Sequence, residues 1–209
     1  MPVASVAFAL LTFLAALGVL LAERRGSQKG KWIAKPLAAV GFVATALAAG
    51  ALDTRYGGLI LLALVLSAAG DVALIPKGTG WPFRIGMLAF LLAHVAFVTA
   101  FAARAPFAPD ALLKAMIGLG LCIGLGSALV RRAPPRLRIP VMAYALAVSA
   151  MAAAAAVSGS PRIATAGVLF LASDVFVALH RFTTPRYLWK VLAVPLYYGA
   201  QIVFATSVG

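Results

Sequence analysis

The chain has 209 residues, 64% of them hydrophobic, and a mean hydropathy of +1.04. This composition excludes an ordinary soluble domain and predicts a polytopic membrane protein. The formal net charge is +13, but the Lys and Arg residues fall in short clusters between apolar runs, where they set membrane topology. We therefore expect membrane lipids, and no nucleic acid, as partners of this chain.

Eight apolar segments follow one another, each close to the ~20 residues that a helix needs to cross the hydrocarbon of a bilayer. Breakers rich in Gly and Pro separate them, and no connection is long enough to hold a second domain. The predicted fold class is therefore all-α, with a single integral membrane domain over residues 1–209. The predicted helices cover residues 3–22, 33–51, 57–75, 84–103, 110–130, 139–157, 163–180 and 187–207.

The connections alternate in charge, and this predicts the orientation of the helices. The first, third, fifth and seventh connections carry fourteen of the 18 Lys and Arg residues. Because connections rich in Lys and Arg stay in the cytoplasm, both termini are expected outside. The Ala- and Arg-rich composition suggests a bacterium, so the predicted location is the inner (cytoplasmic) membrane.

Two carboxylates are unusual because each lies inside an apolar run, Asp71 after Gly70 and Asp174 after Ser173. A carboxylate in hydrocarbon is so costly that such residues usually mark a functional site. Both lie late in helices that run in the same direction, so we expect them at similar depth in the cytoplasmic half. The other acidic residues fall at segment ends: Glu23, Asp53 and Asp110.

The two halves of the chain resemble each other in spacing. Asp71 and Asp174 are 103 positions apart, and Pro36 and Pro140 are 104 apart. Four helices per half restore the same orientation, so the spacing predicts two parallel four-helix repeats about an axis along the membrane normal. Such an axis would bring the two Asp residues face to face in one cavity.

Two carboxyl groups in one cavity form an acid/base pair, because their mutual repulsion leaves one protonated while the other stays charged. The alternative is that each Asp hydrogen-bonds a neighbouring helix and only fixes the packing. Carboxylates within parallel repeats also fit a proton-coupled lipid or small-molecule transporter.

Two basic side chains within the predicted helices, His94 and Lys35, are candidate site residues. His94 is isolated on an apolar helix, and it is either a packing residue or part of the site. Lys35, about one turn into the second helix, is either a lysine that snorkels to the inner surface or an anion site for a lipid phosphate.

Three phenols and one amide also lie well inside the predicted membrane helices. Tyr144, Tyr197 and Tyr198 supply the phenols, and Gln201 either joins two helices by hydrogen bonds or forms part of a cavity wall. The sequence contains no serine-hydrolase elbow, no phosphate-binding loop and no dinucleotide fingerprint, and its two His residues and single Cys form no local zinc motif.

The ordered set of these motifs resembles the YhhN-like family, which includes the lysoplasmalogenases of animals and bacteria. The resemblance extends over the second to the eighth predicted helices. The residues that carry it are Lys35-Pro36, Gly70-Asp71, Phe83-x-x-Gly86-x-x-x-Phe90-x-x-x-His94, Tyr144, Leu169-Phe170-x-x-Ser173-Asp174, Phe182 and Tyr197-Tyr198-x-Ala200-Gln201.

The resemblance implies a hydrolase that cleaves the vinyl ether bond of lysoplasmalogens to a fatty aldehyde and glycerophospho-ethanolamine or -choline. Asp71 and Asp174 are then the expected catalytic pair, with the division of labour known from glycoside hydrolysis. The residues expected to bind the lysophospholipid substrate are Lys35, His94, Tyr144, Tyr197, Tyr198 and Gln201. We expect no cofactor and no metal. The transporter and a structural or lipid-sensing protein stay open as alternatives, as does the oligomeric state.

Overall fold

The computed structural model describes residues 2–104, 116, 120, 124, 127 and 130–209. Within these residues it contains seven helices that are long and apolar enough to cross a membrane. The predicted all-helical membrane architecture is therefore confirmed for the part of the chain described. The helix predicted over 110–130 falls largely outside these residues, and the repeat architecture stays a prediction.

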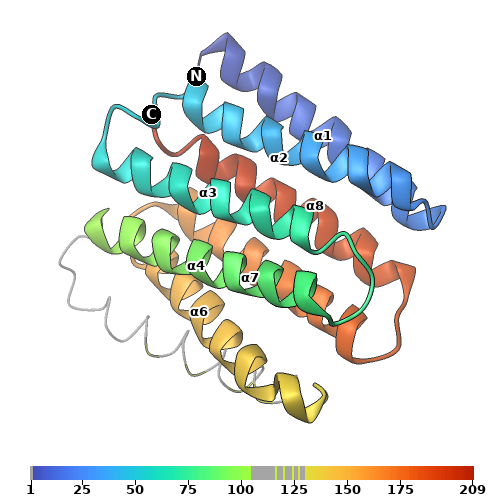
Figure 1. Cartoon of the computed structure of the whole chain (residues 1–209). Coiled ribbons are helices and arrows are strands. Elements are labelled where there is room, and N and C mark those ends of the chain that lie inside the picture. Colours follow the sequence, from blue (N-terminus) through green and yellow to red (C-terminus); the bar gives the residue numbers. More distant parts are fainter. Residues whose placement is uncertain (1, 105–115, 117–119, 121–123, 125–126, 128–129) are drawn as a thin grey trace.

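The helices follow the predicted order and are shown in Figure 1. They are α1 (Val3–Arg24), α2 (Gln28–Ala48), α3 (Arg55–Ala73), α4 (Trp81–Arg104), the short 3₁₀ helix η1 (Pro135–Leu137), α6 (Arg138–Ala156), α7 (Pro161–Phe182) and α8 (Tyr187–Ala205).

The start of α2 differs from the prediction. Ser27 Oγ accepts a hydrogen bond from the Gly30 N–H at 3.1 Å, and such a cap satisfies a backbone donor that has no partner within the helix. The helix therefore begins at Gln28 and not at residue 33, and Pro36 lies inside it. As a result Lys35 lies about two turns into the helix instead of one.

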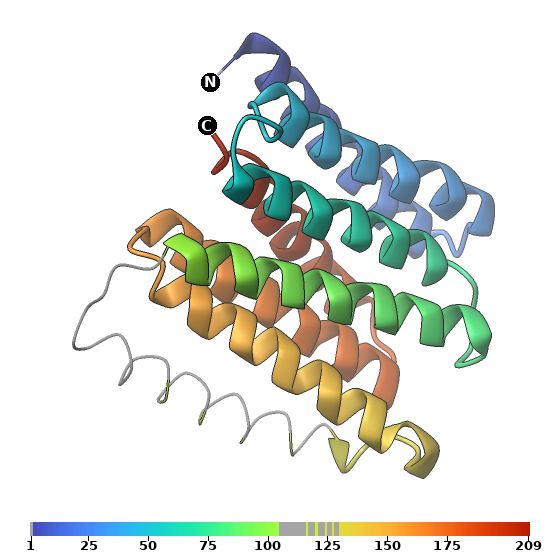
Figure 2. The ribbon, with the colours of Figure 1, turned by 60° about the vertical axis from the view of Figure 1, so that its left-hand side comes forward.

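The helices run side by side as a bundle (Figure 1). Consecutive helices pack as pairs, α1 with α2, α3 with α4, and α7 with α8, while α6 packs between α4 and α7. The last helix, α8, also contacts α1, α2 and α3, so it lies at the centre of the bundle. Figure 2 shows the same arrangement after a turn of the molecule.

Glycines allow the close approach of α3 to α4. A Cβ at Gly70 of α3 would lie 2.6 Å from the ring of Phe90 in α4, and one at Gly86 of α4 would lie 2.7 Å from the Leu74 side chain. Small residues at helix contacts are typical of membrane bundles, where van der Waals packing drives association. This packing fixes the position of Asp71, which follows Gly70.

An aromatic core fills one half of the bundle. Phe97, Phe101, Phe170 and Phe204 are fully buried, and Phe204 packs against Phe97 and Phe101 with ring centroids 4.7 Å and 5.2 Å away. The rings come from α4, α7 and α8, on the side of the bundle where both termini lie. The interior is closed there, so the space for a site lies in the other half.

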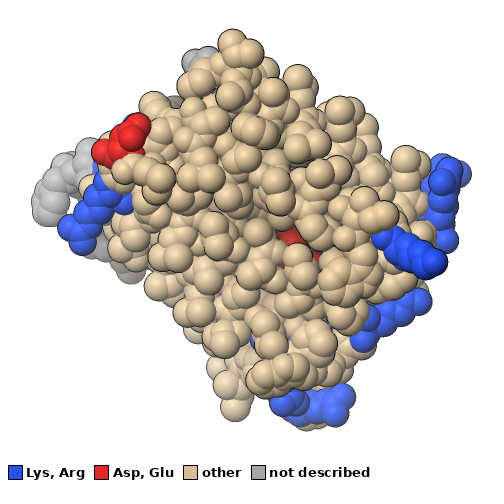
Figure 3. Space-filling model, turned by 45° about the horizontal axis from the view of Figure 1, so that its top comes forward, with Lys and Arg blue, Asp and Glu red and all other residues tan. Residues whose placement is uncertain are grey.

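The opposite end carries the connections at residues 25–27, 74–80, 131–137 and 183–186, and we call it the basic end. Most of the Lys and Arg side chains visible in Figure 3 gather at this end. The structure thus separates the ends of the bundle as the charge pattern predicts. That the basic end faces the cytoplasm stays a prediction.

Candidate functional site

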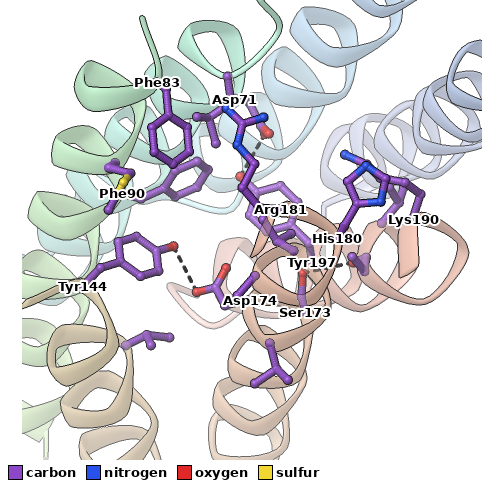
Figure 4. Close-up of a pocket in the computed structure, with 18 of the residues that line it drawn as sticks. Asp71, Phe83, Phe90, Tyr144, Ser173, Asp174, His180, Arg181, Lys190 and Tyr197 are labelled. Carbon is purple, nitrogen blue, oxygen red and sulfur yellow. Dashed lines mark hydrogen bonds between the residues drawn. The ribbon is translucent and has the colours of Figure 1, made fainter. Parts of the chain in front are cut away.

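A cavity of about 430 Å³ lies in the half of the bundle nearer the basic end. All seven long helices contribute to its lining. In Figure 4 the side chains of Asp71, Tyr144, Asp174 and Tyr197 approach the same space from four different helices. Figure 3 shows acidic atoms within a hollow, surrounded by residues that are neither acidic nor Lys or Arg.

Asp71 projects from the last turn of α3 and is buried. Its Oδ2 accepts a hydrogen bond of 2.8 Å from the Tyr197 hydroxyl of α8. Lys35 Nζ of α2 lies 3.6 Å from Oδ1 and donates to the backbone carbonyl of Asp71 at 3.4 Å. An ammonium and a phenol therefore compensate this carboxylate, which burial alone would make very costly.

Asp174 projects from α7 and has a second set of partners. The Tyr144 hydroxyl of α6 donates to its Oδ2 at 3.0 Å, and His94 Nε2 of α4 lies 3.6 Å from the same oxygen. His94 is fully buried between the rings of Tyr144 and Phe170, both of which meet it edge-on. It does not line the cavity, but it contacts two residues that do, Asp174 and Tyr144.

The structure brings six of the eight predicted site residues to the cavity wall: Lys35, Asp71, Tyr144, Asp174, Tyr197 and Tyr198. Gln201, like His94, is fully buried and does not line the cavity. Tyr198 packs edge-on against Tyr197, with the two ring centroids 4.8 Å apart.

Ser173 ties α7 to α8 beside the site. Its hydroxyl donates to the Ala193 carbonyl of α8 at 3.0 Å, and Asp174 follows it directly in the chain. A buried hydroxyl that bonds a neighbouring helix fixes the packing of two membrane helices. This contact therefore sets the rotation of α7 that turns Asp174 towards the cavity.

Charged residues at the mouth of the cavity could not be recognised from the sequence. Glu23 of α1 lies 2.9 Å from Lys31 Nζ of α2 and 3.5 Å from Lys190 Nζ of α8. Arg181 of α7 lies over the Phe83 ring, with its guanidinium carbon 4.3 Å from the centroid. The only signal in the sequence was that Glu23 is one of five acidic residues.

The deeper walls of the cavity are mostly apolar. On α6, Val141, Ala145 and Val148 follow helical spacing, and Leu171 and Val175 do the same on α7. The arrangement therefore combines two carboxyl groups, three phenols and an apolar wall, which suits acid/base chemistry on a lipid chain. Within the described residues, no group of three or more His, Cys, Asp or Glu side chains could hold a metal ion.

Comparisons with known proteins agree with the motifs. The sequence model of the YhhN family matches residues 30–208. The lysoplasmalogenase of Mycobacterium bovis is 35% identical over 153 residues, which cover 69% of this chain and 58% of the relative. Lysoplasmalogenase TMEM86B of Sus scrofa is 30% identical over 174 residues, 82% of this chain and 71% of the relative.

This chain thus spans 58% of the length of the mycobacterial relatives that it matches. No solved structure is significantly similar to it. None of these comparisons supports the transporter alternative.

Proposed function

This chain belongs to the YhhN family, and from that premise we propose that it is a lysoplasmalogenase-type hydrolase. It cleaves the vinyl ether bond of a lysoplasmalogen to a fatty aldehyde and glycerophospho-ethanolamine or -choline. Mycobacterial and mammalian relatives bear the name lysoplasmalogenase.

One observation carries the mechanism: Asp71 and Asp174 line the same cavity from different helices, and each accepts a hydrogen bond from a phenol. Vinyl ether hydrolysis needs a proton donor and a stabiliser of the cation that forms. A pair of carboxyl groups supplies both functions, as it does in glycoside hydrolysis. Tyr197 and Tyr144 hold the two groups in place.

In the first step one carboxyl group protonates the vinyl carbon that is not bonded to oxygen. The π electrons of the vinyl ether form the new C–H bond. The resulting oxocarbenium ion is stabilised by the other carboxylate. Water then adds to the cationic carbon and gives its proton to that carboxylate, which yields a hemiacetal.

In the second step the hemiacetal collapses. The first carboxylate takes the hemiacetal proton, the aldehyde C=O forms, and the bond to the glycerol oxygen breaks. The second carboxyl group protonates the leaving oxygen, so both groups return to their starting states. The balance is one vinyl ether and one water consumed, and one aldehyde and one alcohol formed.

The apolar residues that line the cavity on α6 and α7 are an argument for a substrate with a long hydrocarbon chain. Val141, Ala145 and Val148 on one helix and Leu171 and Val175 on the other line the cavity. Each methylene that leaves water for such a wall contributes about 0.8 kcal/mol. We assign this wall to the alkenyl chain, with the site in the cytoplasmic half of the bacterial inner membrane.

The partners of the two Asp residues also support the proposed repeats. Asp71 is held from α2 and α8, and Asp174 is held from α6 and α4. Four-helix repeats relate α2 to α6 and α4 to α8, so the two sets of partners correspond. His94 and Tyr197 are 103 positions apart, the same spacing as the two Asp residues.

The decisive experiment follows aldehyde release by the purified protein in detergent, where no gradient exists. A panel should contain vinyl-ether lysolipids and ester lysolipids with matched chains and head groups. We expect aldehyde from the vinyl ethers only. A transporter or a lipid sensor would bind these lipids and release no aldehyde, and that result would overturn the proposal.

A further inference from the structure

The mouth of the cavity carries more positive than negative charge. Lys31, Lys77, Arg181 and Lys190 line it from α2, the α3–α4 connection, α7 and α8, and Glu23 is the carboxylate among them. Lys35 is not part of this count because it faces Asp71. The described residues of the mouth therefore hold a surplus of about three positive charges.

Glu23 already has two ammonium partners. Lys31 Nζ lies at 2.9 Å and Lys190 Nζ at 3.5 Å, while the side chains of Glu23, Lys31 and Lys190 are only 14%, 13% and 24% exposed. One carboxylate cannot neutralise two ammonium groups, and removing charges from water is costly unless they are paired. Glu23 thus holds two lysines at the mouth of the cavity. The three partly buried side chains together carry one uncompensated positive charge.

Arg181 adds a cation with a free donor. One terminal nitrogen donates to the Gly78 carbonyl, and the guanidinium carbon lies over the Phe83 ring, 4.3 Å from its centroid. Its Nε–H is buried and has no hydrogen-bond partner among the described residues. Arg181 lines the cavity, and a guanidinium held by such contacts keeps its charge in a fixed position that suits a phosphate.

We propose, on the basis of the proposed function, that Lys31, Lys190 and Arg181 form a phosphate-binding site for the head group of the lysolipid. In a lysoplasmalogen, only the three glycerol carbons separate the phosphate from the vinyl ether oxygen. A phosphate at the mouth therefore leaves the vinyl ether inside the same cavity, where Asp71 and Asp174 lie. Because the mouth has surplus positive charge, it binds anionic head groups more tightly than zwitterionic ones.

The test measures binding and needs no turnover. Ester-linked lysophosphatidic acid, lysophosphatidylglycerol and lysophosphatidylcholine are titrated into the full-length protein in nanodiscs of zwitterionic lipid. A monoacylglycerol of the same chain length is the ligand without phosphate. We expect the two anionic lipids to bind at least tenfold more tightly than lysophosphatidylcholine, and 0.5 M salt to narrow that gap.

Lys190→Met and Arg181→Met should each weaken lysophosphatidylglycerol binding on the order of tenfold, the usual size of a charge-assisted hydrogen bond. Monoacylglycerol binding should not change. Lys29→Met is the matched control, because Lys29 is an exposed lysine of α2 that does not line the cavity. Inorganic phosphate alone, up to millimolar concentration, should not displace the lysolipid.

Three results would overturn this assignment. One is equal loss of monoacylglycerol binding in the two variants, which would mean a structural role. The second is equal affinity for anionic and zwitterionic lysolipids. The third is displacement by millimolar phosphate, which would mark a site for the free anion. Absence of aldehyde release by the unmodified protein would instead count against the proposed reaction, so the two failures are distinguishable.

Discussion

The two carboxyl groups at the cavity, Asp71 and Asp174, have different roles in the proposed mechanism, and each role depends on the other. We expect Asp71→Asn and Asp174→Asn each to lower kcat on the order of 10²–10⁴-fold, the usual contribution of a positioned acid or base. The double variant should be little worse than either single variant, because groups that act as a unit are not additive. Steady-state aldehyde release measures all three.

Asn keeps the volume of Asp and can accept the same phenol hydrogen bonds. The amount of folded protein purified in detergent should therefore not fall. Near-normal turnover in either Asn variant would remove that residue from the mechanism. Independent, multiplicative losses in the double variant would mean that the two groups do not act in the same step.

Lys35 has a contact that the sequence did not predict. Its Nζ lies 3.6 Å from Asp71 Oδ1, so we expect Lys35→Met to lower kcat more than it raises KM. Loss of the ammonium leaves Asp71 with an uncompensated charge, which is strongly unfavourable in a buried site. If only KM rises, Lys35 binds the head group, as the sequence-based expectation had it. Lys29→Met again provides the matched loss of a lysine.

The cavity residues that the sequence indicates most clearly are those that are costly for their surroundings. Asp71 and Asp174 interrupt apolar runs, so the free-energy cost of placing a carboxylate there can be recognised from the sequence. Glu23 and Lys190 are charged residues near segment ends, where charge is ordinary, and they are 167 positions apart. Their contact depends on how α1 and α8 pack, which no local pattern encodes.

At the level of elements, the sequence predicted the order of the described helices because hydrophobic length is a strong signal. The predicted ends of the helices were less accurate, because capping residues and snorkelling side chains determine where a helix begins and ends. Because Ser27 caps α2, the helix begins earlier than predicted and includes Gln28, Lys29 and Lys31. These residues reduced the local hydropathy, and the prediction therefore began the helix too late.

The contact between α3 and α4 can be tested with two glycines of the same helix. At Gly70 a Cβ would lie 2.6 Å from the Phe90 ring, whereas at Gly58 it would meet nothing within 4 Å. We expect Gly70→Ala to cost about 1–3 kcal/mol by overpacking. Gly58→Ala should be neutral or stabilise by up to about 1 kcal/mol, because Ala favours helix.

Thermal unfolding in detergent compares the two variants. Gly70→Ala should also reduce turnover, because Phe90 packs edge-on against Tyr197, the phenol that holds Asp71. Unchanged stability and turnover in Gly70→Ala would mean that α3 and α4 can separate freely, contrary to the packing described above.

At the scale of the whole molecule, the charge asymmetry predicts orientation. Leu52 in the α2–α3 connection and Thr184 in the α7–α8 connection lie at opposite ends of the bundle. In a Cys122→Ser background, we expect Leu52→Cys to react with a membrane-impermeant maleimide on intact bacterial cells. Thr184→Cys should react only after permeabilisation, because the basic end stays in the cytoplasm.

Neither substitution changes the number of charges, so the signal that sets topology is preserved. The reverse labelling pattern would place the mouth of the cavity outside the cell. It would also mean that fourteen of the 18 Lys and Arg residues had been translocated across the membrane.

The cavity has a charged mouth at the basic end and an apolar wall between α6 and α7. The proposed hydrolysis divides one amphiphile into two compounds with opposite solubility. The glycerophosphodiester loses its anchor and diffuses into water, whereas the aldehyde partitions into the bilayer. Under the proposed function, the partition of the two products into different phases opposes the reverse reaction, because the aldehyde and the alcohol are no longer in one compartment.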